Sequence, residues 1–327
     1  MIVGFAASLG LTPLTRQIAM HLGVVDKPVL ARKIHTDNKP MMGGLAIFVA
    51  FAVSLFLFSP PQHIRELAAI ILGAGMVALV GLLDDRFDLS VGLRFAVMGA
   101  AALVLVLAGI QIRLFGSPFL DVPATIIWVI ALTNALNFLD NMDGLSAGLS
   151  AIGAGFALLI ALSQGQILVS LLAAALLGSA IGFLVYNFNP ASTFMGDMGA
   201  LSLGFILGVI AIKLEFAGQP TLVSWMVPVF ALAVPIFDIN LVVWTRLAEG
   251  RKPWLGDKDH TSHRLMALGF TQRQTLFILY GAAVLFGFIG LLISAAPMMI
   301  ALKIGIFMFG IVAVLYGLMI WIRLAKQ

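Results

Sequence analysis

Long apolar runs dominate the chain, and short polar segments separate them. A helix that crosses a bilayer needs about 20 mostly apolar residues. Eleven stretches meet this pattern, at residues 2–20, 43–59, 67–83, 93–110, 122–139, 145–162, 167–186, 201–216, 222–243, 276–293 and 299–322. We expect Pro228 and Pro235 to kink the ninth stretch, because proline removes a backbone donor and clashes with the preceding turn. The pattern predicts an all-α polytopic transmembrane helix bundle of about eleven spans.

The composition agrees with this prediction. Hydrophobic residues make up 61% of the 327 residues, charged residues only 10%, and the mean hydropathy is +1.09. A soluble domain carries about 25% charged residues, so the composition excludes that class. The chain has no cysteine, which excludes a disulfide framework, a thiolate metal site and a cysteine nucleophile. We expect a single integral-membrane domain over residues 1–327.

Lysine and arginine set the expected orientation, because cytoplasmic loops carry an excess of both. With the N-terminus outside, the inner connections and span ends hold fifteen of these residues and the outer ones hold four. This asymmetry predicts an outside N-terminus and a cytoplasmic C-terminus. The outer connections are short and the inner ones are longer and more polar, so we expect the functional site at the cytoplasmic face.

Carboxylates stand at the predicted span ends. They are Asp84, Asp85, Asp140, Asp143 and Asp197; Asp238 is the exception, because it lies inside the ninth stretch just after Pro235, where it is either a further site residue or a polar group in helix packing. A charge at the end of a span is costly unless it meets water, a metal ion or a cation. If the helices alternate in direction, all of these residues lie on one side of the membrane. We therefore expect the helices to gather them into one polar cavity.

Two of these groups allow more than one interpretation. Asp84 and Asp85 can serve as a base and a metal ligand, or as a solvated helix end with Arg86 as partner. The stretch 134–144 is more specific, because Asn137, Asp140 and Asp143 occur among apolar residues at helical spacing. For this stretch we favour a functional role.

The stretch 187–199 points to a divalent cation. Glycines flank Asp197 and let the loop bring its carboxylate close to a ligand. Carboxylate and amide oxygens suit Mg²⁺, which binds through one or two carboxylates together with waters and phosphate oxygens. An Asx-turn at Asp197 is the alternative, and we consider it weaker.

Two basic segments suit anionic ligands. His260, His263 and Arg264 offer hydrogen-bond donors for phosphate oxygens, whereas zinc would need a further soft ligand. The other segment runs from Arg32 and Lys33 to paired glycines at 43 and 44. It can attract a lipid headgroup, or it can be an ordinary positive-inside anchor. Carboxylates, a divalent cation and cationic donors together favour phosphoryl transfer between a lipid phosphate and a nucleotide-activated compound.

These motifs resemble the polyprenyl-phosphate N-acetylhexosamine-1-phosphate transferase superfamily, glycosyltransferase family 4. The resemblance covers nearly the whole chain and rests on residues 39–44, 83–85, 134–144, 187–190, 194–197 and 260–264. Each motif alone is weak, whereas six in the right order at helix ends are specific. The resemblance implies that a UDP-sugar reacts with a polyprenyl phosphate to give polyprenyl-diphosphate-sugar and UMP. It also implies Mg²⁺, with Mn²⁺ as an alternative.

The resemblance assigns roles to individual residues. The expected catalytic residues are Asp84, Asp85 and Asp197, with Asp84 as a base for the lipid phosphate. The expected metal ligands are Asp197 and Asn187. The expected substrate-binding residues are Lys39, Asn137, Asp140, Asp143, Asn187, His260, His263 and Arg264. We favour direct attack by the lipid phosphate over a covalent aspartyl intermediate.

Details of the motifs favour one branch of the superfamily. Ser262 stands where many members have a middle histidine, and residues 39–44 differ from the translocase pattern. These features, with an eleventh span, resemble the GlcNAc-1-phosphate branch, so we expect GlcNAc-1-phosphate transfer to undecaprenyl phosphate in cell-envelope polysaccharide synthesis. The alternatives are a phospho-MurNAc-pentapeptide translocase and, less favoured, an ion-coupled secondary transporter.

We expect a bacterial inner-membrane protein that binds membrane lipids and a UDP-N-acetylhexosamine, with no nucleic-acid partner. A homodimer is a further hypothesis.

Overall fold

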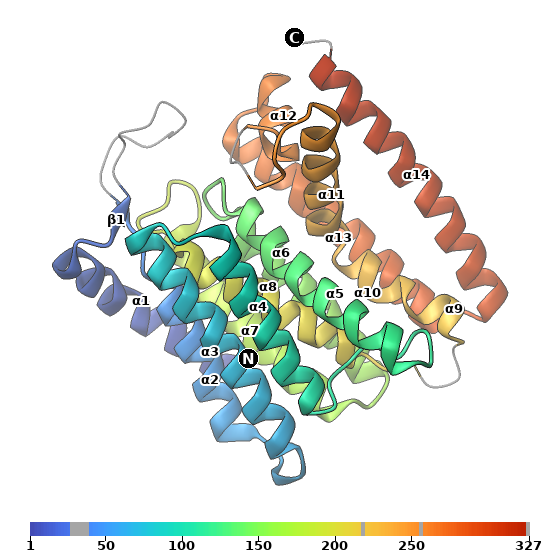
Figure 1. Ribbon diagram of the computed structural model, residues 1–327, viewed down its shortest axis with the longest axis horizontal. Helices are drawn as coiled ribbons and strands as arrows, with labels where there is room; N and C mark the ends of the chain where they lie inside the picture. The colour runs from blue at the N-terminus through green and yellow to red at the C-terminus, as the bar shows by residue number, and fades with distance from the viewer. Residues whose placement is uncertain (27–38, 217–219, 255–257, 325–327) are drawn as a thin grey trace. The chain divides into compact units, whose positions relative to one another are not determined.

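The computed structural model describes residues 1–26, 39–216, 220–254 and 258–324 (Figure 1). The chain forms two compact units, Met1–Leu214 and Glu215–Gln327, and each is described by itself. The single domain expected from the sequence stays a prediction.

The first unit is a helical bundle with one short β-ribbon. Its helices are α1 (Ile2–Leu22), α2 (Gly43–Phe58), α3 (Ile64–Phe87), α4 (Val91–Leu107), α5 (Pro118–Leu139), α6 (Leu145–Ser163), α7 (Ile167–Asn187) and α8 (Gly196–Lys213), with the 3-10 turn η1 (Pro61–His63) before α3. Strands β1 (Val25–Asp26) and β2 (Lys39–Pro40) pair antiparallel, with Asp26 opposite Lys39.

Helix α8 is the buried centre of this unit. Nearly all of its residues are buried, and it packs against α2, α3, α5, α6 and α7. A helix that is apolar on every face is stable only when neighbours surround it. Helix α3 runs antiparallel to α8, because Lys213 Nζ at the end of α8 lies 3.0 Å from Glu66 Oε2 at the start of α3. The opposite ends of the two helices therefore meet at the other side of the unit.

Glycines allow the backbones to approach α8 closely. A Cβ atom at Gly81 of α3 would lie 2.5 Å from the carbonyl carbon of Asp197 and 2.5 Å from the backbone nitrogen of Met198. A Cβ atom at Gly44 of α2 would overlap the backbone of Gly199. Real Cβ atoms do not come this close to backbone atoms, so both positions need glycine. The paired glycines of the 39–44 motif therefore serve helix packing.

The second unit contains a sharply broken helix. Its elements are α9 (Thr221–Ser224), α10 (Met226–Ala231), α11 (Ala233–Ala248), α12 (Thr261–Ala267), α13 (Gln272–Ala295) and α14 (Met298–Leu324). The segments Thr221–Ala231 and Ala233–Ala248 meet at an angle of 84°. Pro235 lies in the first turn of α11. It has no N–H group to bond to the carbonyl of Ala231, and its ring would clash with that carbonyl, so one continuous helix cannot run through both segments. The predicted kink is confirmed.

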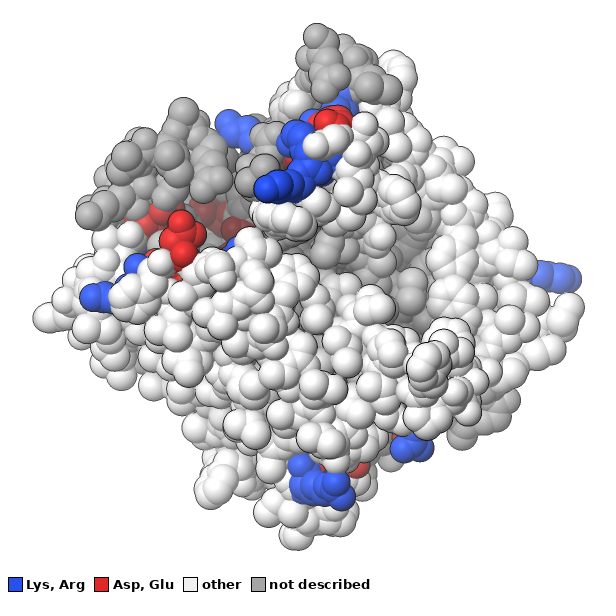
Figure 2. Space-filling view, in the orientation of Figure 1, with Lys and Arg blue, Asp and Glu red and all other residues white. Residues whose placement is uncertain are grey.

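Seven helices in the described part of the chain are long and apolar enough to cross a membrane, or up to eight if the bent pair is one span. Helices α2 and α4 are apolar but shorter. All eleven predicted stretches coincide with a helix or with the bent pair, while the count of eleven spans stays a prediction. Most of the visible surface carries no charged side chain, as expected for a surface in contact with lipid (Figure 2). The protein is an all-α, multi-pass membrane protein.

The close contact at Gly81 gives a first prediction. We expect Gly81→Ala to lower stability by about 1–3 kcal/mol, because the added methyl group must push α3 away from the start of α8. Thermal unfolding of the purified protein in detergent measures the effect. Gly99→Ala in α4 is the matched control, since no atom lies within 4 Å of its added Cβ and alanine favours the helix. Equal melting temperatures for both variants would contradict the packing argument.

Candidate active site

Four helices of the first unit bring polar side chains together at one end. Asn137 at the end of α5 donates from Nδ2 to Asp197 Oδ1 at the start of α8, over 2.8 Å. Arg94 of α4 forms an ion pair with Asp84 at the end of α3, and its Nη1 also lies 3.7 Å from Asp197 Oδ2. Residues far apart in the sequence thus surround the Asp197 carboxylate.

Asp85 holds the first turn of α8. Its Oδ1 and Oδ2 lie 3.2 and 3.0 Å from the backbone nitrogen of Asp197, which donates to both. A carboxylate at this position accepts an otherwise unpaired N–H group and interacts favourably with the positive end of the helix. Gly196 supports the turn with a φ of 67°, which glycine adopts without strain. Asp85 therefore fixes where Asp197 points.

Both oxygens of Asp84 already have partners. Oδ1 accepts from the backbone N–H of Leu89 at 2.8 Å, and Oδ2 accepts from Arg94. The sequence interpretation counted Arg94 only among the positive charges and missed this role. The sequence contains a signal for this contact, because serine favours the position just before a helix. In the structure Ser90 caps α4, where its Oγ accepts from Leu93 N at 3.3 Å, and Arg94 therefore lies in the first turn after the Asp84 segment.

The Asp140 carboxylate lies in an unfavourable environment for charge. Burial, followed by the negative charges of Asp197 and Asp143, raises the pKa of Asp140 to about 8. A carboxyl group with this pKa carries a proton at neutral pH unless a cation approaches. Asp140 is thus suited to donate a hydrogen bond, or to ionise when a cation binds.

Asp143 and Asn187 hold the loop before α8. Asp143 Oδ2 accepts from Ala191 N at 2.9 Å and from Asn189 Nδ2 at 3.2 Å. Asn187 is 2% exposed; its Oδ1 accepts from Gly144 N at 3.1 Å and its Nδ2 donates to Thr193 O at 3.0 Å. Both side chains are engaged with the protein, so this geometry favours positioning roles over direct contact with a metal or substrate.

The Lys39 segment supports the same loop. In β2, the carbonyl oxygen of Pro40 accepts from Phe194 N at 2.8 Å and from Thr193 Oγ1 at 2.9 Å. Gly43 and Gly44 then donate their N–H groups to the carbonyls of Phe194 and Met195 at 3.0 and 2.9 Å. Arg32 and Lys33, which belong to the predicted basic loop, lie outside the described residues.

The remaining predicted residues belong to the second unit. His260 Nδ1 lies 2.7 Å from Asp238 Oδ2, and the His260 and His263 ring centroids are 5.9 Å apart. Arg264 donates from Nε to Asp259 O, from Nη1 to Met319 O and from Nη2 to Thr245 Oγ1, at 2.8, 2.6 and 3.0 Å. These bonds engage every guanidinium nitrogen of Arg264 with the protein, which favours a structural role over phosphate binding.

A single aspartate, Asp259, ties the elements of the second unit together. Asp259 Oδ2 lies 3.0 Å from Arg246 Nε and 3.0 Å from Arg251 Nη2, and Oδ1 accepts from Arg323 of α14. Burial alone would raise the pKa of Asp259, but the hydrogen bonds from Arg323 and Arg246 lower it to about 2. The network links α11, the following loop and α14. Gly256 and Asp257 of this loop lie outside the described residues.

Comparison with known proteins identifies the family of the chain. The sequence profile of glycosyl transferase family 4 matches residues 67–215. A Bacillus subtilis protein named as a probable undecaprenyl-phosphate N-acetylglucosaminyl 1-phosphate transferase is 35% identical, over 93% of this chain and 86% of its own length. The chain belongs to glycosyl transferase family 4. Members from Yersinia pestis and Mycolicibacterium smegmatis are 29% and 31% identical, over 88% and 81% of this chain and 82% and 74% of their own lengths.

The names of these family members confirm the predicted branch. The Yersinia pestis protein is named as an undecaprenyl-phosphate alpha-N-acetylglucosaminyl 1-phosphate transferase, and the Mycolicibacterium smegmatis protein as a decaprenyl-phosphate N-acetylglucosaminephosphotransferase. All three names contain N-acetylglucosamine and a polyprenyl phosphate. The family profile covers Asp84 to Asp197, the segment that builds the carboxylate cluster.

The residue types at this cluster suit Mg²⁺. Within the described residues, no three histidine or acidic side chains are already arranged around a common metal position. Mg²⁺ does not need such a cage, because it binds through one or two carboxylates together with waters and phosphate oxygens. Asp197 and Asp84 come from different helices, and Arg94 Nη1 approaches both carboxylates. Two carboxylates this close repel unless a proton or a cation lies between them.

The raised pKa of Asp140 gives a second prediction, for protein kept metal-free with EDTA. The folded-state pKa lies above the unfolded value, so the stabilising contribution is complete below about pH 4 and is lost as the pH rises through about 8. Asp140→Asn removes this titration. Melting temperatures of wild type and variant between pH 5 and 8.5 should therefore converge at low pH and diverge in favour of the variant at high pH. Parallel curves would contradict the assigned pKa.

Arg94 gives a third prediction. Arg94→Gln should lower the stability of metal-free protein by about 1–3 kcal/mol, because Asp84 loses its cationic partner and Asp197 loses a nearby positive charge. Thermal unfolding at low ionic strength measures this loss. Arg86→Gln is the matched control, since exposed Arg86 donates to the Leu22 carbonyl oxygen at 2.9 Å and forms no ion pair with an acid among the described residues. An equal loss in both variants would show that Arg94 does not balance the carboxylates.

Proposed function

We propose that the protein transfers GlcNAc-1-phosphate from UDP-GlcNAc to undecaprenyl phosphate, forming undecaprenyl-diphosphate-GlcNAc and UMP. The observation that carries the proposal is the meeting of Asp84, Asp140 and Asp197 at one end of the first unit, in a chain of this family. Phosphoryl transfer mainly requires charge neutralisation and positioning, and this cluster is built for a cation and phosphates.

We propose Asp197 as the principal protein ligand of Mg²⁺, with Asp84 beside it. When bound, the ion would neutralise phosphate charge and hold the two reacting phosphates together. Asp85 and Asn137 orient the Asp197 backbone and carboxylate through the bonds described above. Asn187 was a predicted ligand, but its amide already bonds to Gly144 and Thr193, so we assign it to positioning the loop.

In the proposed reaction, an oxygen of the lipid phosphate attacks the β-phosphorus of UDP-GlcNAc. The new P–O bond forms as the bond from the β-phosphorus to the bridging oxygen breaks, and UMP leaves with that oxygen. A phosphate monoester has a second pKa of about 6 and is already largely dianionic at neutral pH. A strong base is therefore unnecessary, which favours direct attack and leaves Asp84 to hold Arg94 and a cation.

The orientation and partners follow from the same proposal. The carboxylate end of the first unit faces the cytoplasm, where UDP-sugars are available, so the N-terminus is outside and the C-terminus is cytoplasmic. The membrane is the bacterial inner membrane, and the product enters synthesis of a cell-envelope polysaccharide. A homodimer remains a hypothesis.

Turnover by the purified protein tests the proposal. Radiolabelled UDP-GlcNAc, undecaprenyl phosphate and Mg²⁺ should give labelled lipid and an equal amount of UMP. UDP-GalNAc and UDP-MurNAc-pentapeptide should give much less product under the same conditions. Preference for UDP-MurNAc-pentapeptide would support the translocase alternative, and no transfer from any UDP-sugar would exclude the reaction.

The role of Asp197 gives a fourth prediction. Asp197→Asn should lower kcat at least about 100-fold, because the carboxylate charge that neutralises the bound cation is lost. The fold should survive, since the amide oxygen can still accept from Asn137. Asp88→Asn is the matched control: Asp88 is exposed at the end of α3 with a φ of 51°, which asparagine tolerates. Near-normal kcat for Asp197→Asn would remove the metal assignment.

A further inference from the structure

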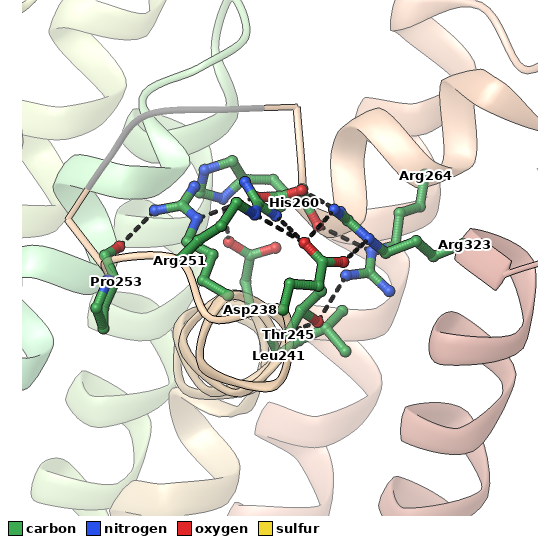
Figure 3. A network of polar contacts seen from close by, with 11 residues as sticks. Asp238, Leu241, Thr245, Arg251, Pro253, His260, Arg264 and Arg323 are labelled. Atoms are coloured by element: carbon green, nitrogen blue, oxygen red, sulfur yellow. Dashed lines mark hydrogen bonds and ion pairs between the residues drawn. The ribbon is translucent and has the colours of Figure 1, made fainter. Parts of the chain in front are cut away.

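A buried acid and a histidine form a pair in the second unit. Asp238 is fully buried in α11, and its Oδ2 lies 2.7 Å from His260 Nδ1. Its Oδ1 accepts from the backbone N–H of Thr261 at 2.7 Å. Both carboxylate oxygens are therefore directed at the start of α12, and this fixes the His260 ring against the broken helix (Figure 3).

The geometry decides which ring nitrogen can meet a ligand. A carboxylate only accepts hydrogen bonds, so the proton of this pair is on His260 Nδ1. Any contact with a substrate must then use Nε2. A partner that bonds to one ring nitrogen of a histidine fixes both the tautomer and the orientation of the ring, and so decides what the other nitrogen can bind.

His263 differs from His260 in the partner of its Nδ1 atom. Its Nδ1 is buried and has no hydrogen-bond partner among the described residues. Burial, followed by the nearby His260, lowers the pKa of His263 to about 4, although Asp238 and Asp259 act in the opposite direction. His263 is neutral at physiological pH, whereas His260 Nδ1 is paired with the Asp238 carboxylate. The two histidines of the motif are thus not equivalent.

We propose that Asp238 is a positioning residue that keeps the proton on His260 Nδ1, so that Nε2 meets a phosphate oxygen of the nucleotide-sugar substrate. This inference rests on the proposed function. The sequence left Asp238 open as a site residue or a helix-packing group, and the structure gives it His260 and Thr261 as partners within its own unit. The proposal assigns Asp238 to the chemistry of the His260 segment.

Ring ¹⁵N NMR tests the tautomer directly in detergent-solubilised protein. The chain has five histidines, and His260→Gln assigns the signal, or variants of the other four assign it by elimination. Wild type should show a protonated Nδ1 on His260, and Asp238→Asn should remove that proton because its amide donates toward the ring. Asn240→Ala on the same helix is the control and should leave the signal unchanged. An unprotonated Nδ1 in wild type would overturn the proposal whether or not any variant folds.

Kinetics and ligand titration test the link to substrate. Asp238→Asn and His260→Gln should each lower kcat/KM about 10- to 100-fold. Loss of a partner that orients a metal-binding histidine lowers activity by a similar factor. The double variant should be no slower than His260→Gln, because Asp238 acts through His260. Additive losses would indicate a separate structural role and contradict the proposal.

Titration with UDP-GlcNAc and Mg²⁺ tests the contact between His260 and phosphate separately from the proposed function. The His260 Nε2 signal should shift on binding, whereas the Nδ1 signal should stay protonated. Saturable binding without an Nε2 shift would overturn the phosphate contact. If wild type transfers no sugar, the proposed function fails, while the ring signals still decide whether Asp238 sets the tautomer.

Discussion

The hydrogen bonds between the Asp85 carboxylate and the backbone N–H of Asp197 are the contact on which the first unit depends. They anchor the start of a fully surrounded helix to the end of α3. Asp143 and Asn187 hold the preceding loop from one direction, and Pro40 holds it from another. The position of the Asp197 carboxylate is therefore set by the backbone of α8. A side chain that is held this way needs little rearrangement when a ligand binds, which is the condition for electrostatic catalysis.

This arrangement concentrates negative charge, which lowers stability unless the charge is compensated. Arg94 compensates part of it by pairing with Asp84 and approaching Asp197, and the proton on Asp140 compensates more. In the proposed function, a divalent cation would replace this compensation by Arg94 and the proton, since an ion can take the place of a proton between carboxylates. The cost in stability and the proposed cation binding thus have one physical cause.

Apolar periodicity predicted where the polar residues fall, because each run ends at a defined residue and antiparallel helices bring alternate ends together. It predicted the break near Pro235 for the same local reason. It did not predict that Asn187 would bond to Gly144 or that Arg264 would bond to the Met319 carbonyl. Those partners lie 43 and 55 residues away, and tertiary packing alone selects them. Arg94 was missed because its role depends on the exact turn of α4 that faces Asp84.

The hydrogen-bond partners of the motif residues distinguish structural residues from candidate ligand-binding residues. Buried polar groups must find partners, so a motif rich in Asp, Asn and Arg can serve the fold as readily as the chemistry. Asn187, Asp143 and Arg264 have their side chains engaged by backbone groups or the protein's own side chains. Within the described residues, His263 Nδ1 is buried and has no hydrogen-bond partner. A ligand gains most where the protein leaves bonding capacity unused, so unused bonding capacity, and not residue type alone, makes a motif residue a candidate for ligand binding.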